Sequence, residues 1–231
     1  MMDPLPEIHL RKVRSFVRRP GRVTAAQRRA LEQLLPRYGV ATAVCPLDLD
    51  ALFGRRAARV FDIGFGDGEA LVTCAANYPQ IDYLGVEVHE PGIGHLLLLL
   101  EKAGLTNVRV IMRDAADVVR EQVGDASFDA VNLFFPDPWP KKRHHKRRLV
   151  QGPFVPMLVE RLESGGVLRI ATDWQPYALE MLATLSGIAQ LRNLALDGAF
   201  VPRPPEREPT RFEQRGARLG HQVWDLAFRR T

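Results

Sequence analysis

A single carboxylate stands between a hydrophobic run and a dense block of positive charge at residues 134–148. The sequence there is FFPDPWPKKRHHKRR, with proline on both sides of Asp137 and with Trp139 after it. The prolines restrict the backbone and lower the entropy cost of holding the acid in place. Six of the residues 141–148 are Lys or Arg and two are His. This pattern predicts an acid at a reactive centre, an aromatic face on which a base can stack, and cations that grip phosphates.

The same stretch has two plainer interpretations. A run of cations is ordinarily the solvated start of a helix, and its position next to PDPW argues against that here. His144 and His145 could in principle bind a metal, but adjacent side chains diverge on a helix and no further ligand follows at a suitable spacing. We therefore expect no metal site.

A glycine-rich loop forms a second candidate site. Residues 62–68 read DIGFGDG, where a buried run gives way to a helical pattern, and glycines there allow a tight turn and close approach to a ligand. Glu87 and Asp114 end the next two expected strands, and an acid after the second strand can accept hydrogen bonds from ribose hydroxyls. The plain alternative is a tight turn without a ligand. Because the three acids stand at three successive strand ends, we expect Asp62, Glu87 and Asp114 to meet in one crevice.

The charge of this loop indicates which ligand it holds. The third glycine of a dinucleotide fingerprint is displaced to Gly68, and a pyrophosphate would meet Asp62, Asp67 and Glu69. A ligand without phosphate and with a positive centre fits better, and S-adenosylmethionine has both properties. The expected cofactor-binding residues are Asp62, Gly64, Gly66, Glu87, Asp114 and Asp137.

Two later segments complete the set of candidate residues. ATDW (171–174) places Asp173 at the end of a strand that reaches the same crevice, although Asp173 could instead cap the following helix. TRFEQRG (210–216) alternates arginines with Glu213, which predicts a lid that grips a polyanion. The alternative for this segment is an ordinary polar loop.

These residues require a framework of alternating strands and helices. Apolar runs predict strands at 58–64, 82–88, 107–112, 127–135 and 167–173, and helical spacing predicts helices at 68–78, 91–104, 115–123, 149–166 and 175–188. Runs at 191–196 and 221–228 read as strands without a helix between them, so we expect them to pair antiparallel. The prediction is an α/β, Rossmann-like fold: a seven-stranded, mostly parallel sheet with an antiparallel last strand and helices on both faces.

Length and composition indicate the class of protein and its cellular compartment. The chain has 231 residues, 46% of them hydrophobic, a net charge of +5 and two cysteines, which predicts a globular protein of a reducing compartment. We expect a basic N-terminal arm or helix at 1–40, either floppy or docking an anion, and a domain at 41–231. Neither a signal peptide nor a membrane-spanning run is evident, so a cytoplasmic protein is expected.

The motifs resemble those of one known family, the bacterial tRNA (guanine-N7)-methyltransferases, which are class I S-adenosylmethionine-dependent enzymes. The resemblance covers about residues 10–229, and the blocks around PDPWPKKRHHKRR and TRFEQRG are more specific than any glycine loop. The matching blocks are RSFVRRPGR (14–22), DIGFGDGEAL (62–71), YLGVEVHEPGIG (83–94), NLFFPDPWPKKRHHKRRLV (132–150), ATDWQPYALEML (171–182) and PTRFEQRGARLGHQVWDLAF (209–228).

The resemblance implies methylation of N7 of guanine 46 in the variable loop of tRNA. It implies cofactor roles for Asp62, Glu87, Asp114 and Asp137, and a catalytic role for Asp137. It implies substrate roles for Lys141, Asp173, Thr210, Arg211, Phe212 and Glu213. One departure is Asp62, where the family pattern has Glu.

This chemistry needs positioning more than proton transfer. Guanine N7 carries a free lone pair at neutral pH, so no base has to remove a proton before attack. Asp137 or Asp173, with Glu213 as a third candidate, is expected to accept hydrogen bonds from guanine N1–H and N2–H₂ on a base held in a loop or flipped out.

Other interpretations remain as alternatives to a tRNA methyltransferase. A nicotinamide dehydrogenase is disfavoured by the displaced glycine and by the lack of a catalytic His or Tyr–Lys pair. A non-enzymatic RNA-binding protein on the same fold is disfavoured by the intact acids, and a small-molecule methyltransferase by the basic block. The sequence leaves a monomer and a homodimer equally open.

Overall fold

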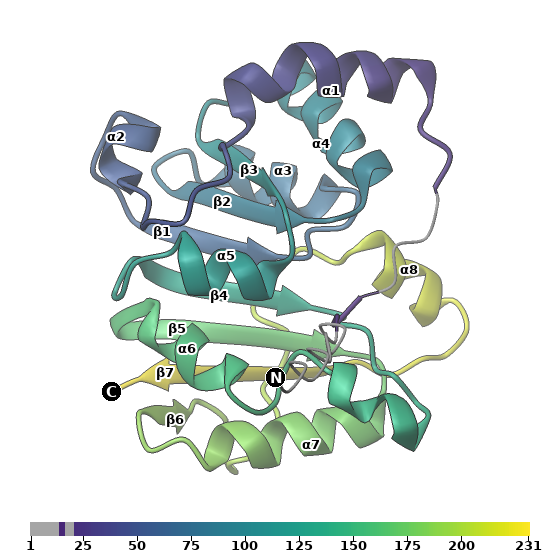
Figure 1. Ribbon diagram of the computed structural model, residues 1–231. Helices are drawn as coiled ribbons and strands as arrows, with labels where there is room; N and C mark the ends of the chain where they lie inside the picture. The colour runs from purple at the N-terminus through teal and green to yellow at the C-terminus, as the bar shows by residue number, and fades with distance from the viewer. Residues whose placement is uncertain (1–13, 17–20) are drawn as a thin grey trace, which may run out of the picture.

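The computed structural model describes residues 14–16 and 21–231, so part of the basic N-terminal segment, including Arg11, Lys12, Arg18 and Arg19, lies outside the described residues. A seven-stranded sheet runs through the molecule in the order β3-β2-β1-β4-β5-β7-β6 (Figure 1). The strands are β1 (Arg59–Ile63), β2 (Asp82–Glu87), β3 (Val108–Met112), β4 (Phe128–Phe134), β5 (Leu162–Thr172), β6 (Leu191–Asn193) and β7 (Trp224–Arg230).

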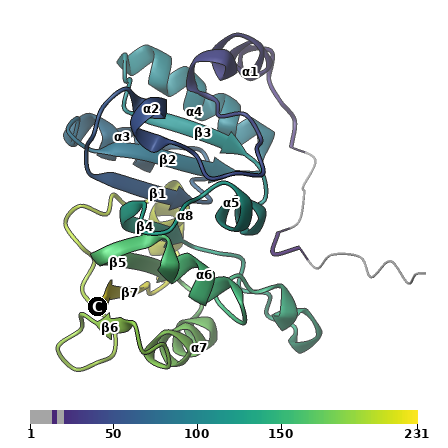
Figure 2. The same cartoon turned by 60° about the vertical axis from the view of Figure 1, so that its left-hand side comes forward.

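Helices cover both faces of this sheet (Figure 2). They are α1 (Ala25–Tyr38), α2 (Leu49–Phe53), α3 (Glu69–Asn77), α4 (Glu90–Ala103), α5 (Ala115–Glu121), η1 (Lys142–Arg147, a 3₁₀ helix), α6 (Phe154–Glu160), α7 (Gln175–Ser186) and α8 (Arg211–Ala217). Helix α1 begins with a capping box, in which the Thr24 and Gln27 side chains bond each other's backbone N–H. The helix then packs along α4.

Alternation along the strands divides the apolar residues between two cores. Val60 in β1 and Tyr83 in β2 pack with α1, α3 and α4 on one face. Their neighbours Phe61 and Leu84 pack with α5, α6 and α7 on the other face. Successive strand residues point to opposite faces, so a sheet covered on both sides needs apolar residues at consecutive positions. The expected α/β fold with helices on both faces is confirmed.

The far edge of the sheet also agrees with the prediction. Strand β7 pairs antiparallel with β5 and with β6, whereas β1 to β5 pair in parallel. The expectation that no helix separates β6 and β7 is wrong, because α8 lies between them in the chain. Thr210 caps α8 by accepting a hydrogen bond from the Glu213 N–H at 3.1 Å.

The predicted bounds of the helix at 149–166 are also wrong at both ends. Helix α6 spans only Phe154–Glu160, and β5 already begins at Leu162. Pro153 stands at the helix N-cap, where its missing N–H costs nothing. The start of β5 contains two glycines and a register shift, in which Leu162 pairs with Phe128 and Val167 with Ala130. Apolar spacing alone did not separate that irregular strand from the helix before it.

The sheet direction places the candidate residues. Strands β1 to β5 all point toward the edge where α8 lies, and β7 points away from it (Figure 1). The loops that follow these five strands therefore gather at one edge. Within the described part of the chain, no helix is both long and apolar enough to cross a membrane.

Candidate functional site

The glycine loop after β1 is open on its outer side. Gly64 and Gly66 have φ angles of 74° and 64°, and a Cβ added to either would meet no atom within 4 Å. On its inner side the loop is packed tightly, because a Cβ on Gly92 of α4 would lie 2.1 Å from the Gly66 carbonyl oxygen. The backbone can therefore approach a ligand at Gly64 and Gly66 while α4 holds the loop from behind.

Glu87 connects the ends of the first three strands. Its Oε2 accepts a hydrogen bond from the Gly66 N–H at 3.0 Å, and its Oε1 accepts from the N–H groups of Val88 and His89. The Glu87 carbonyl oxygen accepts from the Arg113 N–H, next to Asp114. Asp114 caps α5 by accepting from the Ala116 N–H at 3.1 Å. Glu87 and Asp114 thus lie at the ends of neighbouring strands, and part of their acceptor capacity braces the backbone.

Asp62 is buried near the end of β1, and its pKa is raised to about 7. The largest cause is desolvation, which penalises the charged carboxylate. The negative charge of Glu87 raises the pKa further, whereas a hydrogen bond with Asn132 of β4 lowers it. A positive centre above the loop would relieve this accumulation of acids, and a phosphate would add to it.

The turn that carries Asp137 has an unusual backbone. Phe135 and Trp139 have φ angles of 53° and 45°, which non-glycine residues seldom adopt, and they enclose the Pro136–Pro138 segment. The Phe135 N–H donates to the Ala171 carbonyl oxygen of β5 at 2.7 Å. Asp137 itself is exposed at the end of β4. The turn therefore presents this carboxylate outward on a fixed backbone.

The basic block divides into surface cations and one buried anchor. Lys141, Lys142, Arg143 and Lys146 are exposed around η1, available to a polyanion. Arg148 was expected among them, and this prediction is wrong. Its side chain is 3% exposed, its Nε donates to the Pro138 carbonyl oxygen at 2.9 Å, and it forms an ion pair with Glu180 of α7. Arg148 fastens the Asp137 turn to α7, which a count of charges in the sequence does not reveal.

Trp139 also has neighbours that the sequence did not indicate. Its Nε1–H donates to the Ser15 carbonyl oxygen at 3.1 Å. The Arg147 guanidinium lies over its ring, 4.7 Å from the centroid, and His144 meets the ring edge-on. One face of the indole is therefore covered by Arg147, and a stacked base would have to use the opposite face or displace Arg147.

Asp173 follows β5 and does not cap α7. The N-cap of that helix is Trp174, which makes no side-chain capping bond, so the capping alternative is wrong. The Oδ2 atom of Asp173 lies 3.4 Å from Nδ1 of His221, in the loop between α8 and β7. This contact brings the end of β5 next to the TRFEQRG segment.

Helix α8 lies between the glycine loop and the Asp137 turn. Arg211 forms ion pairs with Glu69 and, at 3.4 Å, with Asp67 on the glycine-loop side. The Phe212 ring lies 5.3 Å from the ring of Phe135, two residues before Asp137. The segment expected as an RNA-gripping lid is therefore a short helix that contacts both expected sites at once.

The remaining candidates are placed differently. Lys141 is exposed immediately before η1, and Thr210 acts as the α8 N-cap. Glu213 points back into the protein, where both of its oxygens accept hydrogen bonds from Arg207 at 2.6 and 2.9 Å. Arg207 was not singled out from the sequence, because a lone arginine in a Pro-rich polar stretch carries no local signal of burial.

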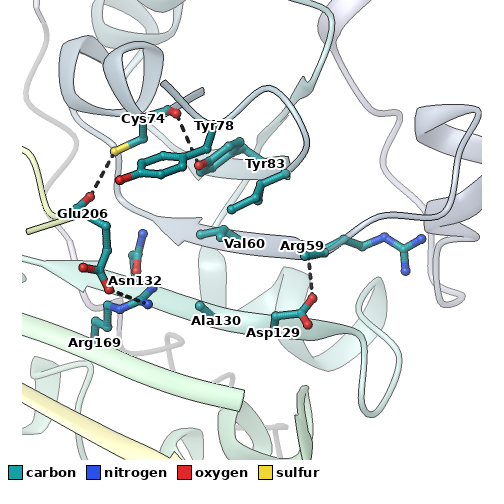
Figure 3. A pocket seen from close by; sticks show the side chains of 12 residues that line it. Arg59, Val60, Cys74, Tyr78, Tyr83, Asp129, Ala130, Asn132, Arg169 and Glu206 are labelled. Atoms are coloured by element: carbon teal, nitrogen blue, oxygen red, sulfur yellow. Dashed lines mark hydrogen bonds and ion pairs between the residues drawn. The ribbon is translucent and has the colours of Figure 1, made fainter. Parts of the chain in front are cut away.

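A cavity of about 360 Å³ lies on the α3 face of the sheet, apart from the strand ends (Figure 3). Arg169 of β5 and Glu206 form an ion pair at 3.0 Å on one side, and the Cys74 thiol donates to the Glu206 carbonyl oxygen. Burial raises the pKa of Cys74 to about 11. The thiol is therefore protonated near neutral pH and is a poor nucleophile.

Comparison with known proteins gives a consistent result. A family model described as "putative methyltransferase" matches residues 56–226. A tRNA (guanine-N(7)-)-methyltransferase of Halorhodospira halophila is 57% identical over 220 residues, which cover 95% of each chain.

Solved structures agree at the level of the fold. A 16S rRNA methyltransferase, KamB, superposes with a TM-score of 0.59 at 14% identity, covering 84% of this chain and 99% of that one. A Streptococcus mutans protein solved in complex with SAH gives a TM-score of 0.50 at 13% identity, covering 80% and 98%. The sheet order, the acid-lined glycine loop and the identity across nearly the whole chain agree with one another, and the chain belongs to the family of the tRNA (guanine-N7)-methyltransferases.

Proposed function

We propose that this protein transfers a methyl group from S-adenosylmethionine to N7 of a guanine in tRNA, and that the guanine is residue 46 of the variable loop. The observation that carries the proposal is the position of α8, which pairs with the glycine loop through Arg211 and packs on the Asp137 turn through Phe212. One short helix thus adjoins both the acid-lined crevice and the start of the basic block. A protein with this function works in the cytoplasm, where tRNA is modified.

The crevice suits S-adenosylmethionine, which supplies an electrophilic methyl group on a sulfonium. Gly64 and Gly66 leave open space above the loop. Asp62 and Glu87 supply negative charge, and the raised pKa of Asp62 is relieved by a cation nearby. These residues fit the cofactor, and Asp62, Glu87, Asp114 and Asp137 are the side chains we assign to holding it.

The chain's own task in this reaction is to position guanine and to exclude water. Guanine N7 attacks with its own lone pair, so Asp137 need only orient the reacting groups. The exposed cations Lys141, Lys142, Arg143 and Lys146 surround η1, directly after that acid. They are suited to contact phosphates of the strand that carries the base.

Among the acids proposed to recognise the guanine edge, the contacts favour Asp173 over Glu213. Both oxygens of Glu213 already accept hydrogen bonds from Arg207, and its side chain is 10% exposed. The Asp173 side chain is 21% exposed, and its Oδ2 lies 3.4 Å from His221 Nδ1. A carboxylate with a free edge can accept from guanine N1–H and N2–H₂ together.

The decisive experiment is transfer of labelled methyl groups to unmodified tRNA, followed by mapping of 7-methylguanine through borohydride–aniline cleavage. We expect one cut in the variable loop, and a loss of at least about 100-fold in kcat/KM for Asp137→Ala. Asp125→Asn is the matched control, because that acid is 73% exposed at the other end of β4. Cofactor binding without any label in tRNA would refute the proposed substrate.

A further inference from the structure

Arg207 is buried between two carboxylates, although it belongs to no helix or strand. Its side chain is 1% exposed. Nη1 and Nη2 donate to the two oxygens of Glu213 at 2.6 and 2.9 Å, while Nε and Nη2 contact the two oxygens of Asp225 at 2.6 and 3.1 Å. The pair with Glu213 is bidentate, whereas Asp225 accepts one hydrogen bond, from Nη2, and its Oδ1 lies beside Nε without hydrogen-bond geometry. Two carboxylates on one guanidinium still fix its position.

The flat faces of the same group lie near aromatic rings. The Arg207 guanidinium carbon is 5.5 Å from the Phe134 centroid and 6.0 Å from the Phe135 centroid, at the end of β4. Phe212 of α8 packs on the Phe135 ring as well. Arg207 therefore connects three parts that are distant in sequence: the strand end leading to Asp137, helix α8 through Glu213, and strand β7 through Asp225.

The charges in this cluster make each member depend on the others. Burial raises the pKa of Asp225, and the positive charge of Arg207 opposes that effect. Arg203 approaches Glu213 only from the solvent side, at 3.8 Å and with 52% exposure. The buried Arg207 is thus the principal counter-charge for two carboxylates, and its loss would leave them facing each other.

We propose that Arg207 is the positioning residue of the tRNA-binding segment 210–213, and that Glu213 acts through Arg207 as the anchor of α8 and does not read the guanine edge. This inference rests on the proposed function, because it assigns the segment's task to tRNA binding. Locking α8 against β7 sets the direction of Arg211 and Phe212 toward the glycine loop and the Asp137 turn.

The test is a double-substitution series of Arg207→Lys, Glu213→Gln and the pair, with Arg203→Lys as the matched control. Lysine keeps the charge and loses the two-sided fork. We expect Arg207→Lys to lower kcat/KM for tRNA by about 10- to 100-fold, with the cofactor Kd unchanged and Arg203→Lys near the parent. Amide exchange in residues 211–217 should become faster in Arg207→Lys, in Glu213→Gln and in the pair, and stay at the parent rate in Arg203→Lys.

The double variant shows whether Glu213 anchors α8 through Arg207 or contacts the guanine base itself. If Glu213 acts through Arg207, Glu213→Gln adds less than about twofold to the loss already caused by Arg207→Lys. A full additional loss would show that Glu213 contacts the substrate by itself, and would overturn the proposal. An Arg207→Lys variant that behaves like Arg203→Lys would overturn it equally.

Two further measurements test the proposal if Arg207→Lys does not fold or if the protein methylates no tRNA. If Arg207→Lys does not fold, Asp225→Asn removes one charge with little change of shape, and a fall in kcat/KM for tRNA at constant cofactor Kd is again expected. An Asp225→Asn variant with an unchanged kcat/KM for tRNA would then overturn the proposal. If the parent protein methylates no tRNA, the proposed function fails, and unchanged exchange at 211–217 in Arg207→Lys would separately refute the anchor.

Discussion

At the scale of single residues, Asp62 shows how environment changes a carboxylate that the sequence could only locate. The position of the acid after a buried run was readable, since it preceded the glycine loop. Its raised pKa was not, because that depends on burial and on the charge of Glu87, which lies 25 positions further along the chain. The carboxyl group is consequently half protonated near neutral pH in the free protein.

Asp62 should make the protein less stable as the pH rises. Its folded pKa of about 7 lies above the unfolded value, so the folded state binds the extra proton between about pH 4 and 7. The free energy of unfolding should therefore fall across that window, by at most about 4 kcal/mol. Asp62→Asn should flatten this slope in urea titrations at pH 5 and pH 8, whereas the exposed Asp125→Asn should retain it.

Cofactor binding should change the protonation of the Asp62 carboxyl group. A cation over the glycine loop favours the ionised form of Asp62, so binding near pH 6 should release a proton. Calorimetry in buffers of different ionisation enthalpy would measure this release with the cofactor or with SAH. Equal proton release by the parent and by Asp62→Asn would contradict the assignment.

At the scale of elements, Arg148 fastens the Asp137 turn to α7. Removing its guanidinium leaves the Pro138 carbonyl oxygen and Glu180 without their buried partner. Arg148→Met should lower the free energy of unfolding by about 2–4 kcal/mol and weaken activity through looser positioning of Asp137. Arg143→Met, on the exposed side of η1, is the control and should leave thermal unfolding nearly unchanged.

The contact of α8 with the glycine loop should survive when Arg211 and Glu69 exchange their charges. Arg211 is 59% exposed, so solvent screening weakens its pairs with Glu69 and Asp67. Arg211→Glu should speed amide exchange in α8 by up to about fivefold, and Glu69→Arg in addition should restore it. Arg215→Glu, in the last turn of α8, is the control, and adding Glu69→Arg should not restore amide exchange in that variant.

The Asp137 turn and helix α8 show which features the sequence predicts and which it does not. Periodicity and glycines predicted the alternating strands and helices and the place of Asp62, Glu87 and Asp114 at the ends of β1 to β3, because those follow from local pattern. Arg148 looked like its exposed neighbours, and Arg207 stood in a polar stretch. Their burial depends on Glu180 and Asp225, which are distant in sequence. The short helix α8 was missed for a similar reason, since its one buried residue is Gly216.

At the scale of the whole molecule, exposed cations and the acid-lined crevice share one edge of the sheet. Each phosphate contact contributes about 0.7–0.9 to the slope of log K against log salt concentration. Lys142→Ala at η1 should therefore reduce the slope of tRNA binding by about one unit or less. Lys102→Ala, in the last turn of α4, is the control. An unchanged slope for Lys142→Ala would remove that lysine from the tRNA interface.

The place of β7 within the sheet has a consequence for synthesis on the ribosome. Strand β6 precedes β7 in the chain, yet it pairs only with β7 among the named strands, and β7 lies between β5 and β6. A nascent chain that has emerged only as far as residue 220 presents β5 as an open edge, which invites pairing with other chains. Asp225 arrives with β7, so Arg207 also receives its second carboxylate last. The segment proposed to hold tRNA therefore acquires its full anchor only after β7 has been made.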